Sequence, residues 1–231
     1  SLAGDFQALK AVCERENIVL MDDPLDMLSL ARCMTRYPGR RVGKVAVLTT
    51  SGGGGAISAD RLSEVGVTLA QFESKTAQAL SEHYSPGQAD NPIDIGGRRH
   101  EGKAAIGTVS AEIALADPNT DLALIVMTTA PDVPGLTQEF VHGIQSPLAQ
   151  GKPALFVMLP GRVGELARRT LIDSGIPYVD TLAEGVNIVR AWKAWSEHRE
   201  AQAPVRPAQH VRVPAVTPGA MGEKAAKALL A

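Results

Sequence analysis

The sequence predicts an α/β fold: a flavodoxin-like, doubly wound parallel sheet arranged as a three-layer sandwich. Two observations carry this prediction. From Val45 onward, short and fully apolar runs alternate with amphipathic stretches, which is typical of parallel strands that helices cover on both faces. Within the amphipathic stretches, apolar residues recur at steps of three and four, as in Val109, Ile113 and Ala116. Each predicted helix therefore has one apolar stripe to place on the sheet.

Five apolar runs are the predicted strands of the main domain, which we place at residues 42–198. They are Val45–Thr50, Val67–Phe72, Asp121–Thr128, Pro153–Leu159 and Ile176–Val179. Six amphipathic stretches are the predicted helices. They are Ala56–Val65, Lys75–His83, Gly102–Ala116, Leu136–Leu148, Val163–Asp173 and Ala183–His198.

The two ends of the chain differ from this main domain. Residues 1–41 are predicted to be a helical lead-in, with helices at Asp5–Glu14 and Pro24–Arg36 and an edge strand at Ile18–Met21 between them. Residues 199–231 begin as a proline-rich linker that is too poor in apolar periodicity to build a core. A helix then restarts at Glu223–Leu230. Because the chain starts with Ser1 instead of Met, we expect a fragment of a longer protein.

Composition excludes several classes of function. The chain has 231 residues, 45% of them hydrophobic, with 23 basic against 25 acidic side chains and a net charge of −2. This charge provides no long-range attraction for nucleic acid or an anionic membrane, so we expect neither as a partner. The two cysteines, Cys13 and Cys33, form neither a disulfide framework nor a metal-ligand pattern. We therefore expect no metal site. No apolar run reaches the roughly 18 residues of a membrane helix, so we expect a cytoplasmic protein.

The most informative loop follows the first predicted strand. It consists of Ser51, Gly52, Gly53, Gly54, Gly55 and Ala56. Four consecutive glycines let backbone amides turn toward a ligand without obstruction by Cβ atoms, and the start of the next helix adds about half a positive charge. The spacing fits neither a Walker motif nor a dinucleotide-binding motif. We therefore predict a phosphate-binding site at residues 51–56. The alternative is a turn that only tightens the packing of strand against helix.

A second candidate segment runs from Asn91 to Gly97, just before an Arg-Arg-His sequence at residues 98–100. The proline at position 92 favours an extended Asn91, and the paired glycines let the chain pass close to a neighbour. Asp94 is suited to orient the glycine loop, and the two arginines are suited to hold a phosphate. We take Asn91, Asp94, Gly96 and Gly97 as site-lining residues, with a purely structural turn as the alternative.

Several segments together resemble the NDP-forming acyl-CoA synthetases, which are relatives of succinyl-CoA synthetase. They are Thr50–Ala56 with Asp60, Gly66-Val67, Asn91–Asp94, Asp121–Leu124, Gly151–Pro153 and Ser174–Pro177. They follow the family's order along the whole chain. The resemblance implies the family's second flavodoxin-like CoA-ligase domain, similar to the carboxyl-terminal domain of the succinyl-CoA synthetase β subunit. The chain departs from the family's Thr-Asn-Ala-Gly-Gly pattern at Thr50 and Ser51, which puts a role for an Asn side chain in doubt but leaves a backbone anion site.

The resemblance also implies a reaction. In that family, acyl-CoA and phosphate give an acyl phosphate, the phosphoryl group moves to a histidine, and the histidine loop carries it to an ATP-grasp domain that forms ATP. Residues 51–56 would then present amides to the phosphate of the phosphohistidine. No catalytic residue is expected within this chain, because the phosphohistidine is expected upstream of Ser1. The implied cofactors of the longer enzyme are CoA, ATP or ADP, and phosphate, with Mg at the absent ATP-grasp domain.

The implied partners are the other domains of the same enzyme: a CoA-binding domain, the CoA-ligase domain that bears the phosphohistidine, and the ATP-grasp domain. Residues 1–41 would be the tail of the preceding CoA-ligase domain, and the last residues the start of a truncated ATP-grasp region. A small carboxylic acid is the implied substrate. Whether the chain forms a homodimer is a question that the resemblance leaves open. The chain alone is expected to be inactive. Two alternatives remain: a stand-alone flavodoxin-like docking module, or the pseudo-ligase regulatory part of a protein acetyltransferase.

Overall fold

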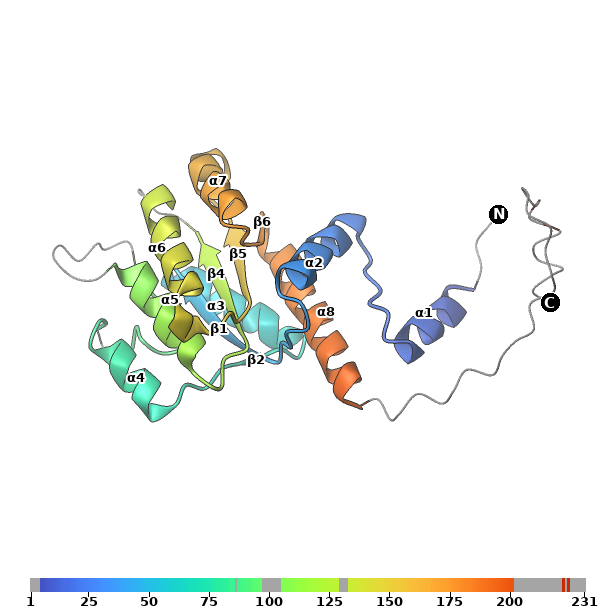
Figure 1. Cartoon of the computed structure of the whole chain (residues 1–231), viewed down its shortest axis with the longest axis horizontal. Coiled ribbons are helices and arrows are strands. Elements are labelled where there is room, and N and C mark those ends of the chain that lie inside the picture. Colours follow the sequence, from blue (N-terminus) through green and yellow to red (C-terminus); the bar gives the residue numbers. More distant parts are fainter. Residues whose placement is uncertain are drawn as a thin grey trace. The chain divides into compact units, whose positions relative to one another are not determined.

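The computed structural model describes residues 5–85, 87–96, 105–128 and 133–201, together with residues 222 and 224. The chain divides into two compact units, residues 1–200 and 201–231, and everything below concerns the first. This unit is built around a parallel sheet with helices on both faces, so the α/β prediction is confirmed (Figure 1). Among the described residues, no helix combines the length and the apolar character needed to cross a bilayer.

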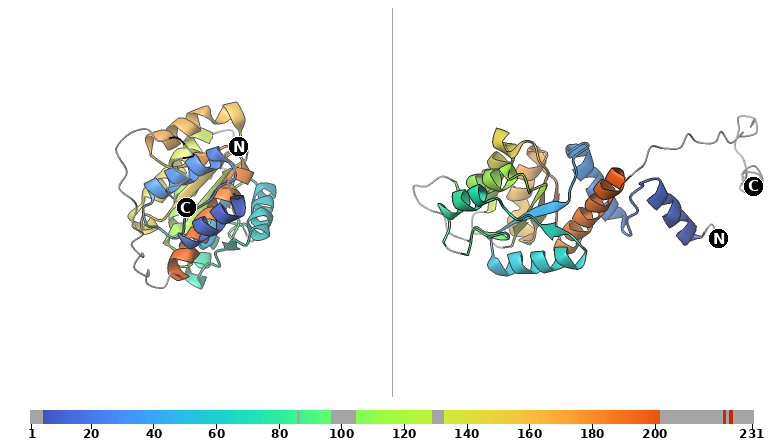
Figure 2. Two further views of the ribbon diagram at one scale, coloured as in Figure 1. Left: turned by 90° about the vertical axis from the view of Figure 1, so that its right-hand side faces the viewer. Right: turned by 90° about the horizontal axis from the view of Figure 1, so that it is seen from below.

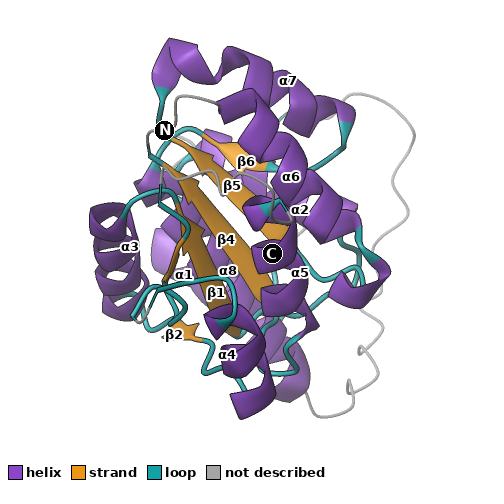
Figure 3. Cartoon of the chain, turned by 90° about the vertical axis from the view of Figure 1, so that its left-hand side faces the viewer, coloured by secondary structure: helices purple, strands orange, loops and turns teal. Residues whose placement is uncertain are grey.

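The sheet has the strand order of a doubly wound flavodoxin-like fold (Figure 3). All its pairings are parallel, in the order β2-β1-β4-β5-β6. The strands are β1 (Lys44–Thr49), β2 (Thr68–Leu69), β4 (Leu122–Met127), β5 (Ala154–Met158) and β6 (Tyr178–Val179). Strand β2 lies on one side of β1, and β4, β5 and β6 follow on the other side. The loops that follow β1 and β4 therefore meet at the carboxyl edge of the sheet, where the strand order changes direction.

Two apolar cores lie on the two faces of the sheet. Successive residues of β1 alternate between them: Ala46 and Leu48 point into one core, and Val45 and Val47 into the other. The helices that contribute to the first core are α4 (Ser74–Ser81), α5 (Ile106–Ala116), α6 (Val133–Gln145) and α7 (Glu165–Asp173). Those of the second are α2 (Pro24–Arg36), α3 (Gly52–Glu64) and α8 (Leu182–Ala201). Burial on both faces explains why β1, β4 and β5 have almost continuously apolar sequences.

Three further helical elements lie in the described part of the chain. They are α1 (Phe6–Arg15) and the 3₁₀ turns η1 (Pro147–Ala149) and η2 (Gly161–Gly164). An aspartate caps each of the first two helices: Asp5 accepts a hydrogen bond from Gln7 N at 2.9 Å, and Asp23 accepts one from Leu25 N at 2.7 Å.

The outer edge of β1 is shared by two short strands. β2 pairs with residues 44 and 45, and β3 (Ile93–Asp94) pairs with residues 48 and 49. The side chain of Asn91 fills the gap between them. Its Oδ1 accepts a hydrogen bond from Val47 N at 2.9 Å, and its Nδ2 donates to the carbonyl oxygens of Val45 and Ala70, both at 2.9 Å. Asn91 therefore continues the hydrogen bonding of β1 where no strand lies beside it.

The structure corrects three predicted boundaries. The strand expected at Val67–Phe72 is only two residues long, because Asn91 and β3 take over the edge of β1 beyond Ala70. The edge strand expected at Ile18–Met21 is absent from the described chain; Val19 and Met21 pack their side chains against the second core without joining the sheet. Helix α3 begins at Gly52 instead of Ala56, so the four glycines lie in its first turn.

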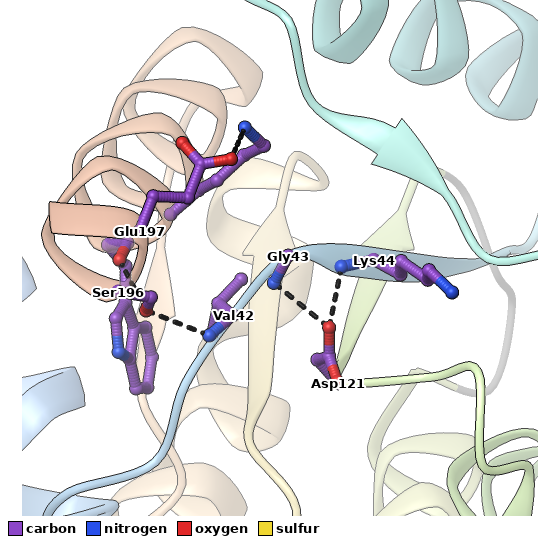
Figure 4. A network of polar contacts seen from close by, with 8 residues as sticks. Val42, Gly43, Lys44, Asp121, Ser196 and Glu197 are labelled. Carbon is purple, nitrogen blue, oxygen red and sulfur yellow. Dashed lines mark hydrogen bonds and ion pairs between the residues drawn. The ribbon is translucent and has the colours of Figure 1, made fainter. Parts of the chain in front are cut away.

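The entry into β1 is held at the amino end of the sheet by two side chains (Figure 4). The backbone N–H groups of Gly43 and Lys44 both donate to Asp121 Oδ2, at 3.0 and 2.8 Å. One residue earlier, Val42 N donates to Ser196 Oγ of α8 at 3.0 Å. Asp121 directly precedes β4, so this carboxylate fixes the register at which β1 and β4 start.

Helix α2 and its C-cap residue place two ionisable groups in the second core. Burial raises the pKa of the Cys33 thiol from 9.0 to about 12 and the pKa of the Tyr37 phenol from 10.0 to about 12. The charges of the neighbouring Arg32 and Arg36 lower the pKa values of Cys33 and Tyr37, respectively, only partly. Both groups therefore stay neutral in the folded chain at pH values where the unfolded chain begins to lose their protons.

We predict that the free energy of unfolding falls as the pH rises from 9 toward 12, since the unfolded chain releases the Cys33 proton first. This thiol contributes a slope of up to about 1.4 kcal/mol per pH unit. A Cys33→Ala variant should show a shallower decline between about pH 9 and 10.5, measured by urea unfolding. Cys13→Ala controls for the loss of a buried thiol. Equal slopes in wild type and Cys33→Ala would contradict the prediction.

Candidate functional site

The predicted phosphate site lies where β1 ends and α3 begins. Ser51 is the N-cap of α3: its backbone is extended, with φ −157° and ψ 128°, and its hydroxyl accepts a long hydrogen bond of 3.5 Å from Gly54 N. The first full bond of the helix runs from Gly55 N to the Ser51 carbonyl at 2.9 Å. Ser51 is half-buried, and Gly52, Gly53 and Ala56 are exposed.

Two backbone donors at this helix start are free. Across the described residues, no hydrogen bond uses the N–H of Gly52 or of Gly53. The first N–H groups of a helix have no partner within the helix, and its dipole favours a negative group beside them. A Cβ atom at Gly53 would meet only Ser51 Oγ, at 3.9 Å. A Cβ atom at Gly52, in contrast, would lie 3.1 Å from Asp94 Oδ2. An anion therefore has open access at Gly53 and meets a carboxylate beside Gly52.

The other two glycines serve packing. A Cβ atom at Gly54 would lie 2.5 Å from Thr128 Cγ2 and 3.1 Å from Thr49 Oγ1. One at Gly55 would lie 3.1 Å from both Pro92 Cβ and Thr49 Cγ2. The absence of a Cβ atom at Gly54 and Gly55 thus lets α3 approach the strand ends. Phosphate binding at residues 51–56 stays a prediction.

Three threonines that sequence reasoning did not assign to the site hold this corner together. Thr50 Oγ1 lies 3.0 Å from Thr128 Oγ1 and accepts a hydrogen bond from Thr128 N at 3.0 Å, which ties the end of β1 to the end of β4. Thr49 Oγ1 donates to the Ser51 carbonyl at 3.1 Å and accepts from Ser51 N at 3.2 Å. The sequence did contain a sign of this contact. Two of the predicted strands each end in a threonine, and a parallel sheet brings the ends of neighbouring strands together.

The second candidate segment reaches the same corner through β3. Asp94 lies beside the first turn of α3, where its Oδ2 would be 3.1 Å from a Cβ atom at Gly52. Its Oδ1 accepts a hydrogen bond from Gly96 N at 2.9 Å. Asn91 lies further back, with its amide engaged by the sheet as described above. Gly97 and residues 98–100, as well as residues 129–132 after β4, lie outside the described residues.

Asp94 affects what this corner can bind. Its carboxylate places negative charge close to the positive end of α3, which weakens the attraction for a fully ionised oxyanion. The same carboxylate accepts hydrogen bonds, so it favours a ligand that brings both an oxyanion and an O–H or N–H donor. Burial raises the pKa of the nearby Tyr84 phenol, and the Asp94 charge adds to that rise against the lowering effect of Ser110, so the phenol stays neutral.

Cavities and ionisable clusters elsewhere do not compete for this role. Three cavities, of about 400, 750 and 450 Å³, line other parts of the surface, and none includes residues 51–56. Within the described ranges, no group of three or more His, Cys, Asp or Glu side chains is arranged to hold a metal ion.

Comparisons with known proteins agree with this fold. No protein-family model matches the chain. The "Acetate--CoA ligase [ADP-forming] II subunit alpha" of Pyrococcus furiosus is 33% identical over 183 residues, which cover 77% of this chain and 39% of that protein. The "Acetate--CoA ligase [ADP-forming] I" of Archaeoglobus fulgidus is 30% identical over 77% of this chain and 24% of that protein.

The chain is homologous to part of the ADP-forming acyl-CoA synthetases. The family resemblance inferred from the sequence is thereby confirmed. The chain spans less than half the length of the acetate–CoA ligases it matches. Among solved structures, the dinucleotide-forming acetyl-coenzyme A synthetase 1 of Candidatus Korarchaeum cryptofilum shares the fold, with a TM-score of 0.76 and 21% identity over 87% of this chain and 43% of that one. A second structure of that synthetase, in complex with phosphate and ADP, has a TM-score of 0.74 with 21% identity over the same shares of the two chains.

We predict that alanine has different effects on stability at two adjacent glycines of this domain. Gly54→Ala should lower the free energy of unfolding by about 1–3 kcal/mol, because its methyl group would overlap Thr128 Cγ2. Gly53→Ala should change it by less than about 1 kcal/mol, since the added methyl meets open space. Urea unfolding of the two variants beside wild type tests this. Equal destabilisation at both positions would mean that the second half of the glycine run is not packed as described.

Proposed function

We propose that this chain is the phosphate-cradling and interface domain of an NDP-forming acyl-CoA synthetase. In the whole enzyme, acyl-CoA, NDP and phosphate would interconvert with a carboxylic acid, CoA and NTP through an acyl phosphate and a phosphohistidine. The one observation that carries the role of this domain is the pair of free, exposed amides of Gly52 and Gly53 at the start of α3. The domain supplies positioning and charge stabilisation and no nucleophile, so the chain alone is inactive in this proposal.

The chemistry of the donor set supports a phosphoryl ligand. Backbone amides at a helix start are already oriented, so they stabilise an oxyanion without reorganising. Asp94, beside Gly52, makes the corner better suited to a phosphoryl group that carries a hydrogen-bond donor than to a free dianion. A phosphorylated imidazole has both properties when its second ring nitrogen carries a proton. This combination agrees with a phosphohistidine that another domain presents.

The remaining cofactors and partners of this proposal belong to other domains. CoA, ADP or ATP, and the Mg that accompanies the nucleotide would bind to the CoA-binding, phosphohistidine-bearing and ATP-grasp domains. Residues 51–56, Asp94 and Gly96 form the surface that those domains would meet. The carboxylic acid substrate would be bound where domains join.

Two other functions are less well supported by the site and by the comparisons. A stand-alone docking module would have no use for two exposed amides beside an acidic side chain. The pseudo-ligase part of a protein acetyltransferase would share the fold, but the named relatives are acetate–CoA ligases. The fold by itself does not separate these functions, so the discrimination depends on the behaviour of residues 51–56.

The test is a titration of the chain with inorganic phosphate, followed by amide chemical shifts in NMR spectra. We expect shifts confined to residues 51–56 and to Asp94 and Gly96. Gly53→Val should weaken phosphate binding roughly tenfold, about 1.4 kcal/mol, because its side chain would cover both free amides while meeting only Ser51. Ile57→Ala, an exposed position on the same helix, is the matched control.

In the full-length parent enzyme, Gly53→Val should slow phosphoryl transfer, and turnover with a panel of carboxylic acids, CoA and nucleotides would identify the substrates. Phosphate shifts that leave residues 52–56 untouched, or transfer at an unchanged rate in Gly53→Val, would refute the assignment of the site.

A further inference from the structure

A surface groove runs between α2 and α7, on a different part of the domain from the start of α3. It has a volume of about 750 Å³ and is lined by one face of α2, by the end of α7 and by the segment that links α7 to β6. Figure 2 shows the two helices as ribbons, α2 in blue and α7 in light orange. No residue of the proposed phosphate site lines this groove.

The walls and floor of the groove are apolar. Leu28 of α2 and Ile172 of α7 stand on opposite sides, and each is 57% exposed. Leu171 and Ile176 form the floor and are fully buried beneath it. Large aliphatic side chains on both rims of one open groove gain free energy when a partner covers them.

Two guanidinium groups, one helical turn apart on α2, border the same groove. Arg32 stacks on the ring of Tyr178 with Cζ 5.6 Å from the ring centroid, and Arg36 stacks on Tyr37 at 5.2 Å. Arg36 Nε also donates to the Gly175 carbonyl at 2.9 Å. The groove lining contains no Asp or Glu, and within the described chain neither arginine forms an ion pair with a carboxylate.

Stacking fixes each guanidinium and leaves most of its five N–H donors unused. Two immobilised cations at helical spacing beside an apolar groove complement a particular partner surface. That surface has apolar residues on one face and carboxylates one turn apart along the edge of that face. An α-helix of an acidic protein presents this pattern, because residues four apart in sequence are neighbours on a helix.

We propose that the groove between α2 and α7 docks an acidic amphipathic helix of a protein partner. The apolar face of that helix would fill the space between Leu28 and Ile172, and its carboxylates would bind Arg32 and Arg36. This inference is independent of the phosphate site, since the two surfaces share no residue.

The test uses a designed 14-residue helical peptide with leucines along one face and two glutamates one turn apart at its edge. Its matched control has lysines in place of the glutamates. Binding to the full chain is measured by fluorescence anisotropy and by methyl NMR shifts of Leu28, Ile172 and Ile176. We expect the acidic peptide to shift these methyl groups and to bind at least tenfold more tightly than the lysine peptide.

Charge reversal on the protein sharpens the test. The double variant Arg32→Glu/Arg36→Glu should reverse the preference and favour the lysine peptide, which a merely structural role of the arginines would not produce. Arg61→Glu, at an exposed arginine of α3, should leave the preference unchanged. Equal binding of the two peptides, no methyl shifts at millimolar peptide, or binding of anionic lipid vesicles in place of the acidic peptide would overturn the proposal.

Discussion

The hydrogen bonds of Asn91 are the interaction on which the carboxyl edge of this domain depends. A strand in the middle of a parallel sheet needs partners along both sides, and one side of β1 meets only two strands of two residues each. The amide of Asn91 satisfies the backbone groups between them. Because Asn91 is held there, the chain turns at Pro92 to form β3, and β3 carries Asp94 to the first turn of α3. The position of the candidate site is thus a consequence of how the sheet is closed.

The four consecutive glycines meet two requirements, close packing of α3 against the strand ends and exposure of the first turn of α3. At Gly54 and Gly55 the backbone of α3 lies against Thr49, Thr128 and Pro92, and no side chain fits between them. At Gly52 and Gly53 the same absence of side chains exposes the helix start. The close packing of the second pair immobilises the amides of the first pair, and such preorganisation is what makes backbone donors effective toward an oxyanion.

The sequence supported the fold better than the site, for physical reasons. Strands buried on both faces have continuous apolar runs, so β1, β4 and β5 were located within one or two residues. The strand β3 was missed because two residues carry no periodicity, and its existence depends on a side chain that substitutes for backbone. The start of α3 was placed four residues late, since glycine is a poor helix former and only packing against the strand ends keeps residues 52–55 helical. Nothing in the sequence showed which glycines would be packed and which would be open.

Both edges of the sheet end in strands of two residues, β2 with β3 on one side and β6 on the other. Within the described chain, these edges therefore present little unpaired backbone onto which a foreign strand could be added. This arrangement discourages fibril-like stacking of exposed sheets. Addition of a partner's strand to the sheet is therefore disfavoured at both edges.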